Sequence, residues 1–140
     1  MVQAVHIRVL LADDEPMVRQ ALRSALQGYP NIEIVGEASD GEEAVAAASQ
    51  LQPSVIVMDI SMPKMDGIMA TQLIKAQHPQ IAVIGLSVHV KDHPVDAMGQ
   101  AGASEVLRKD NAVTELYSAV QRAIASLQPV LLLGDTHVAA

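Results

Sequence analysis

Val55-Ile56-Val57-Met58-Asp59-Ile60-Ser61-Met62-Pro63 is the stretch of sequence that decides the fold. Its first half is an unbroken apolar run rich in Val and Ile, which is typical of a strand buried on both faces of a parallel sheet. Asp59 ends this run, and Pro63 four residues later indicates a turn. In open α/β sheets, ligands and chemistry are found at the carboxyl edge of the strands. We therefore expect Asp59 to lie at that edge and to be the central functional residue.

Predicted strands and helices alternate on both sides of this stretch. The expected strands cover residues 7–12, 31–38, 55–59, 81–87 and 105–109. The expected helices cover residues 16–28, 39–51, 68–78, 94–101 and 113–127. Short connections between alternating strands and helices favour an α/β fold, a single doubly wound parallel sheet of five strands with five helices. The last helix should bury Val113, Leu116, Tyr117, Val120, Ile124 and Leu127 on one face, and Pro129 should break it.

Composition limits the class of protein. The chain has 140 residues, of which 50% are hydrophobic and 18% charged, so it can form one folded domain rather than a disordered segment. We expect a domain at 1–128 and a C-terminal tail or linker remnant at 129–140. A formal net charge of −7 opposes nucleic-acid binding by this domain. There is no apolar run of about 20 residues, no signal peptide and no cysteine, so we expect a cytoplasmic protein that does not enter a membrane.

Polar side chains fall at the ends of four predicted strands. Asp13 and Asp14 follow the first, Asp59 ends the third, Ser87 ends the fourth and Lys109 ends the fifth. Carboxylates gathered at one sheet edge repel one another, and a hard cation relieves this repulsion. The pattern therefore predicts a site for Mg²⁺, or for Mn²⁺, which prefer carboxylate and carbonyl oxygens.

These residues resemble those of the receiver domain of two-component response regulators, a superfamily that includes the chemotaxis regulators. The resemblance covers residues 6 to about 127. It rests on Asp13-Asp14, on 58–63 with Met65-Asp66-Gly67, on Leu86-Ser87, and on Leu107-Arg108-Lys109. It implies the flavodoxin-like strand order 2-1-3-4-5, and it implies that a sensor histidine kinase or a histidine phosphotransfer domain phosphorylates Asp59.

The resemblance also implies the metal ligands. By comparison with the family, Asp14 ligates Mg²⁺ directly and Asp13 does so directly or through water. Asp59 and the backbone carbonyl of Ser61 complete the protein ligands.

Phosphoryl transfer needs an oxygen nucleophile and positive charge around the transferred group. Asp59 would be the nucleophile, Lys109 would add positive charge, and the Ser87 hydroxyl would donate a hydrogen bond to a phosphoryl oxygen. In the family, the positions of His89 and Ser61 influence how fast the acyl phosphate hydrolyses. The phosphorylated side chain would draw Ser87 and Lys109 toward it and so switch the conformation of nearby loops.

The sequence departs from the family pattern at two positions. Val106 stands three residues before Lys109, where an aromatic residue often reports the switch, so that readout should be absent. Asp110 follows Lys109 in place of the usual cis proline, and we expect a trans bond because a cis bond without proline costs about 3–4 kcal/mol. Tyr117 should pack on the last helix.

Other functions fit the residues less well. A phosphatase of the haloacid dehalogenase type needs a second Asp two residues after the nucleophile, and that position is Ser61. A flavin-binding module would need aromatic residues that stack on the flavin ring and a hydroxyl-rich loop that binds its phosphate after the first strand. Asp13 and Asp14 follow that strand and would repel the phosphate. A P-loop enzyme is excluded because no Gly-Lys-Ser/Thr loop occurs.

The output stays open at the level of sequence. The chain could be a receiver that acts as an interaction module without phosphorylation, a stand-alone regulator, the terminal receiver of a hybrid histidine kinase, or a receiver excised from a protein with a DNA-binding domain. We expect a signalling domain with no enzymatic activity beyond its own phosphorylation and dephosphorylation. A homodimer is possible, through the fourth helix, fifth strand and fifth helix or through the first and fifth helices.

Overall fold

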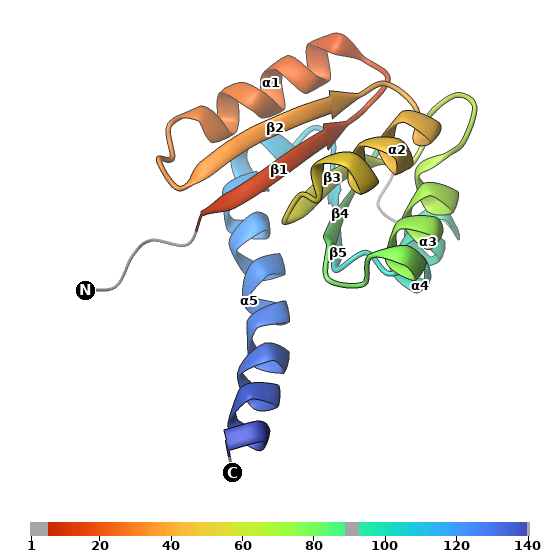
Figure 1. The fold of residues 1–140 in the computed structure, drawn as a ribbon. Helices are drawn as coiled ribbons and strands as arrows, with labels where there is room; N and C mark the ends of the chain where they lie inside the picture. The colour runs from red at the N-terminus through yellow and green to blue at the C-terminus, as the bar shows by residue number, and fades with distance from the viewer. Residues whose placement is uncertain (1–5, 89–92, 140) are drawn as a thin grey trace.

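The computed structural model describes residues 6–88 and 93–139, with side chains for 6–88 and 94–127. Within these residues, five strands form one parallel sheet in the order β2-β1-β3-β4-β5 (Figure 1). The strands are β1 Ile7–Ala12, β2 Ile32–Ala38, β3 Val55–Asp59, β4 Ala82–Ser87 and β5 Glu105–Arg108. The predicted fold class and strand order are confirmed.

Local sequence signals determine where the helices begin. The helices are α1 Pro16–Gln27, α2 Gly41–Leu51, α3 Gly67–Gln77, α4 His93–Ala101 and α5 Ala112–Ala139. Pro16 opens α1, where its missing N–H costs nothing. Asp40 and Asp66 cap α2 and α3, each by accepting a hydrogen bond at 2.8 Å from the backbone N–H three residues later.

The sheet separates two hydrophobic layers. One face packs against α1 and α5, with Leu22 and Leu116 among the fully buried side chains. The other face packs against α2, α3 and α4, through residues such as Ile74 and Met98. Every residue of β3 is buried, as its unbroken apolar run predicts. The central strand therefore holds Asp59 at a fixed point of the sheet edge.

Two predictions about α5 are wrong. Pro129 does not break the helix, which continues to Ala139 and extends past the sheet (Figure 1). A proline inside a helix removes one backbone hydrogen bond at a cost of about 3 kcal/mol, and good helix formers such as Leu on both sides favour continuation. Val113 is 51% exposed rather than buried, because it lies in the first turn of α5, where Ala112 fills the core instead.

No helix among the described residues combines the length and the apolarity needed to cross a lipid bilayer.

Candidate functional site

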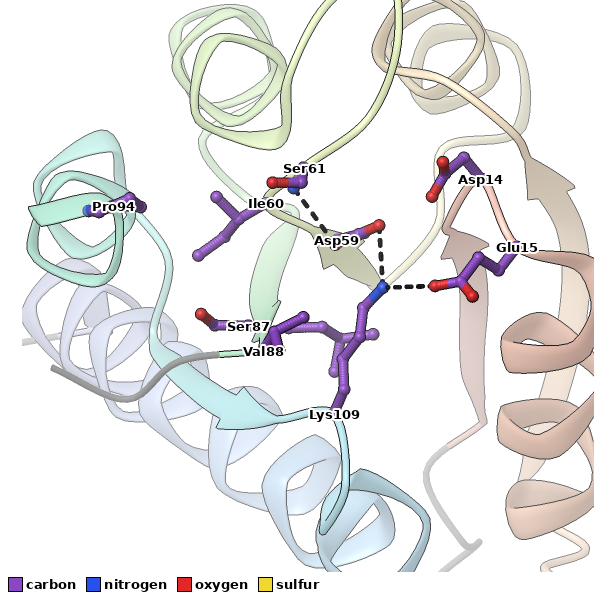
Figure 2. Close-up of a pocket in the computed structure, with 10 residues that line it drawn as sticks. Asp14, Glu15, Asp59, Ile60, Ser61, Ser87, Val88, Pro94 and Lys109 are labelled. Atoms are coloured by element: carbon purple, nitrogen blue, oxygen red, sulfur yellow. Dashed lines mark hydrogen bonds and ion pairs between the residues drawn. The ribbon is translucent and has the colours of Figure 1, made fainter. Parts of the chain in front are cut away.

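Most of the predicted polar residues meet at the carboxyl edge of the sheet, namely Asp14, Asp59, Ser61, Ser87 and Lys109 (Figure 2). They surround a cavity of about 380 Å³. The cavity is lined by Asp14, Glu15, Asp59, Ile60, Ser61, Leu86, Ser87, Val88, Pro94 and Lys109. Asp13, which is fully buried, lies beside this cavity and contacts Lys109.

Backbone hydrogen bonds of the sheet continue past the strand ends and bring these residues together. Asp13 N–H donates to Ala38 O (3.0 Å), just beyond β1. Lys109 N–H donates to Ser87 O (2.8 Å), just beyond β5. Asp59 is the last residue of β3, directly opposite Leu86 of β4. The site is therefore attached to the hydrogen-bonded framework of the sheet.

Lys109 is the cation of this site. Its Nζ lies 3.0 Å from Asp13 Oδ2, 3.1 Å from Asp59 Oδ2 and 3.3 Å from Glu15 Oε1. Figure 2 shows its side chain extending toward Asp59 and Glu15. Glu15 was not predicted as a site residue, although its place directly after Asp13-Asp14 was a usable signal. One ammonium group thus forms ion pairs with three carboxylates.

Asp13 has one oxygen that is incompletely satisfied. Its Oδ1 accepts a hydrogen bond from Glu15 N–H (2.8 Å). Its Oδ2 is buried and has Lys109 Nζ as an ion-pair partner, but it accepts no well-aligned hydrogen bond. A buried carboxylate oxygen in this state is costly without a further cationic or hydrogen-bonding partner.

The acidic residues fit a divalent cation. Asp13, Asp14 and Asp59 each offer a carboxylate oxygen, and the three oxygens lie within 4.8 Å of one another. Mg²⁺ prefers a few carboxylates together with water and phosphate oxygens, and the incompletely satisfied Asp13 oxygen belongs to this group. Ser61 lines the same cavity.

The surroundings change the pKa of Asp59. Burial, and next the charge of Asp13, raise the pKa of this carboxyl to about 7, although Lys109 opposes the shift. For Lys109, burial favours the neutral amine, but the contacts with Asp13 and Asp59 outweigh this and raise its pKa above the usual value. At neutral pH and without a further cation, Asp59 is therefore partly protonated and Lys109 is charged.

The remaining predicted residues have separate outcomes. Ser87 is buried and lines the cavity, and Ser61 N–H donates to Asp59 Oδ1 at 3.2 Å. His89 lies outside the described residues.

The Lys109–Asp110 bond is trans, as expected. Tyr117 packs against the core and stacks on Tyr29 with 3.5 Å between ring centroids, so its predicted packing role is confirmed.

Val106 occupies the position, three residues before Lys109, at which the family often has an aromatic residue. It is half-buried and packs against the hydrophobic layer that contains Met98. Gly85 of the neighbouring strand leaves the space for both side chains, because a Cβ at this position would lie 3.0 Å from Met98 Cγ and 3.2 Å from Val106 Cγ2. The space beside Val106 is thus filled by aliphatic groups.

Comparison with known proteins identifies relatives of this chain. A family described as response regulator receiver domain matches residues 9–121. The transcriptional regulatory protein LiaR of Bacillus subtilis (strain 168) is 43% identical over 117 residues, which are 84% of this chain and 56% of the relative. The response regulator protein VraR of Staphylococcus aureus (strain Mu3 / ATCC 700698) is 39% identical over 116 residues, which are 83% of this chain and 56% of the relative.

The structural comparison agrees with the sequence comparison. The signal receiver domain of the putative response regulator NarL from Mycobacterium tuberculosis superposes with a TM-score of 0.82 at 30% identity, and the match covers 87% of this chain and 98% of that chain. Against LiaR and VraR, however, this chain spans only about half the length of the relative.

Proposed function

The chain belongs to the response regulator receiver domain family, and from this we propose that Asp59 is the residue that accepts the phosphoryl group in a two-component phosphorelay. The observation that carries the proposal is the cluster of Asp13, Asp14 and Asp59 with Lys109 at one sheet edge. Such a cluster combines a nucleophilic carboxylate oxygen with the ammonium group of Lys109 and with carboxylates that can bind a cation. That combination is what transfer of a phosphoryl group requires.

The transfer step exchanges one bond to phosphorus for another. The bond between phosphorus and the imidazole nitrogen of a phosphohistidine donor breaks as a bond to a carboxylate oxygen of Asp59 forms. The imidazole leaves with the electron pair and takes up a proton from solvent. Lys109 stabilises the negative charge of the phosphoryl oxygens, and the Ser87 hydroxyl donates a hydrogen bond to one of them.

Asp13, Asp14 and Asp59 would hold Mg²⁺ or Mn²⁺ through carboxylate oxygens, with the backbone carbonyl of Ser61 as a further ligand. When bound, the ion supplies positive charge that favours the ionised form of Asp59 and the charge of the transferred group. The raised pKa of Asp59 supports this role, because an ionised nucleophile at neutral pH needs an additional cation.

The donor in this scheme is a sensor histidine kinase or a histidine phosphotransfer domain. The chain has no enzymatic role in the proposal beyond the phosphorylation and dephosphorylation of its own Asp59. Two of the relatives are described as a transcriptional regulatory protein and a response regulator, so we infer that the output is regulatory. With its net charge of −7, this domain would not contact nucleic acid itself. The proposal includes a homodimer as one of the forms in which this domain acts.

The proposal is tested by intact-mass spectrometry after incubation with a small acyl phosphate. We expect the wild-type mass to rise by one phosphoryl group in the presence of Mg²⁺ and to stay unchanged in EDTA. Asp59→Asn should show no increase, whereas Asp110→Asn, a matched substitution of an exposed aspartate paired with Arg108, should behave as wild type.

A phosphoryl adduct on Asp59→Asn would contradict the assignment of the acceptor. Wild-type protein that never gains a phosphoryl group under these conditions would instead favour an interaction module that works without phosphorylation.

A further inference from the structure

The connection between β3 and α3 contains a tight turn at Lys64. The Met65 N–H donates to Pro63 O at 2.7 Å, which closes a three-residue γ-turn. Lys64, at its centre, has φ of 67°, a left-handed value that side chains other than glycine disfavour. A turn of this kind is strained, and it persists only where neighbouring structure holds it.

The start of α2 is what lies against this turn. Gly41, the first residue of α2, is buried, and a Cβ at this position would collide with Met65 O and lie 2.7 Å from the Met65 carbonyl carbon. Lys64 Nζ also lies 3.6 Å from Asp40 Oδ2, an oxygen of the buried residue that caps α2. The backbone of the turn is thus in direct contact with α2, and only glycine permits this contact.

The other end of the connection is tied to the acidic cluster. Gly67 N–H donates to Ile60 O at 2.8 Å, and a Cβ at Gly67 would collide with the backbone oxygen of Asp59. Ser61 N–H donates to Asp59 Oδ1. Ser61 therefore lies on a short connection that is fixed at Asp59 on one side and at the γ-turn on the other.

We propose that the packing of Gly41 against the γ-turn at Lys64 positions the Ser61 backbone and thereby sets the affinity of the acidic cluster for a divalent cation. This inference rests on the proposed function. Gly41 and Lys64 touch neither the cation nor the phosphoryl group, so they are positioning residues. A displaced turn would move the Ser61 carbonyl while Asp13, Asp14 and Asp59 stay on their strands.

The first test changes the glycine and measures Mg²⁺ binding by isothermal titration calorimetry. Gly41→Ala should raise the Kd for Mg²⁺ about 10-fold or more, which is the size of effect typical of residues that orient metal ligands. In EDTA, hydrogen exchange of the Met65 and Gly67 amides should become faster, while exchange in β4 stays unchanged. Gly99→Ala is the matched control, because a Cβ there has no atom within 4 Å.

The second test compares two substitutions of one exposed residue, so that loss of folding cannot explain the result. Lys64→Gly and Lys64→Val both remove the ion pair with Asp40, but only glycine accepts a φ of 67° without strain. The Kd of Lys64→Gly should stay within about 3-fold of wild type, and that of Lys64→Val should rise about 10-fold.

Equal Mg²⁺ affinity of the two Lys64 variants, or wild-type affinity of Gly41→Ala, would overturn this inference and leave the proposed function intact. Wild-type protein that binds no Mg²⁺ would overturn the metal site of the proposed function and the inference together.

Discussion

Asp59 and Lys109 show how single side chains set the charge balance of the site. Asp59 is 2% exposed and lies beside Asp13, so its ionised form is disfavoured and its pKa rises to about 7. Lys109 partly offsets this repulsion but is shared with Asp13 and Glu15. The metal-free site therefore has more negative charge than its single lysine neutralises, and this excess is what a divalent cation would remove.

The pKa of Asp59 predicts how stability depends on pH. The unfolded chain loses this proton at about pH 3.9, whereas the folded chain keeps it to about pH 7. Between these values the folded state binds more protons, so ionisation of Asp59 destabilises the fold as the pH rises. Asp59→Asn removes this effect. In EDTA, urea denaturation should find it nearly equal in stability to wild type at pH 4 and about 1–3 kcal/mol more stable at pH 8.

Asp110→Asn, which changes an exposed aspartate paired with Arg108, is the matched control for the same denaturation. A difference between Asp59→Asn and wild type that is the same at pH 4 and pH 8 would contradict the raised pKa of Asp59.

Lys109→Ala is expected to leave the fold intact but to uncouple phosphorylation from the conformational change. The variant would lose the ammonium group that is drawn to the phosphoryl oxygens, although Asp59 and the metal ligands would remain. Hydrogen exchange of β4 and β5, with and without an acyl phosphate and Mg²⁺, should show a response in wild type and little in the variant. A wild-type response of Lys109→Ala would count against the assigned role.

At the scale of elements, α1 is attached to the sheet by packing and by charge. Leu22 and Leu26 pack into the hydrophobic layer beneath the helix. Arg19 Nε and Arg23 Nη2 contact the two carboxylate oxygens of Glu37 on β2, at 2.7 Å and 2.6 Å. The hydrogen bond from Arg23, with further contributions from Arg19, lowers the pKa of Glu37. These ion pairs fix the helix that begins directly after the acidic residues of the site.

Glu37→Gln should lower the free energy of unfolding by about 0.5–1 kcal/mol at pH 7, the range for ion pairs that are partly open to solvent. Because the pKa of Glu37 is lowered in the folded state, this stabilisation is present above the unfolded pKa and is lost as the pH falls through the folded pKa. Denaturant titrations at pH 7 and pH 3 measure the difference. Glu33→Gln, on the same strand but more exposed, should have a smaller effect at pH 7, and an equal effect would contradict the assignment.

At the scale of the whole molecule, α5 has two parts with different surroundings. Its first part, up to Leu127, contributes side chains to the hydrophobic layer shared with α1. Its last part extends beyond the sheet (Figure 1). The chain also spans 56% of the length of LiaR, in which further sequence accompanies the matched region. We therefore propose that 1–128 is sufficient for the receiver and that 129–140 is dispensable for its folding.

A chain truncated after Gln128 should unfold within about 2 °C of the full chain and should gain a phosphoryl group on Asp59 at the same rate. The hydrophobic layer keeps all of its described members in this chain, so little stability is lost. Thermal unfolding followed by circular dichroism measures the first quantity and intact mass the second.

Truncation after Ala119 is the matched control. It removes Val120 and Ala123 from the core and should prevent cooperative unfolding. A fall of more than about 5 °C on truncation after Gln128 would show that the last part of α5 belongs to the folded domain.

The sequence by itself determined the strands, the parallel sheet and most of the site, whereas the order of the strands came from the resemblance to the receiver family. These features follow from local patterns: a buried apolar run ending in Asp59, capping residues such as Asp40, and polar residues at the ends of parallel strands. Since parallel strands all end at one edge, knowing the strand ends was enough to bring Asp13, Asp59, Ser87 and Lys109 together.

Only the tertiary structure decided the features that depend on contacts between distant segments. The raised pKa of Asp59 comes from burial and from Asp13, which is 46 residues earlier in the chain. Two further features depend on how helices and loops are placed in space. They are the contact of Gly41 with the turn at Lys64 and the ion pair between Glu15 and Lys109. The exposure of Val113 likewise depends on where α5 meets the sheet. Periodicity and local propensity report the conformation of a segment, whereas burial, electrostatic interaction and steric fit depend on what lies beside it.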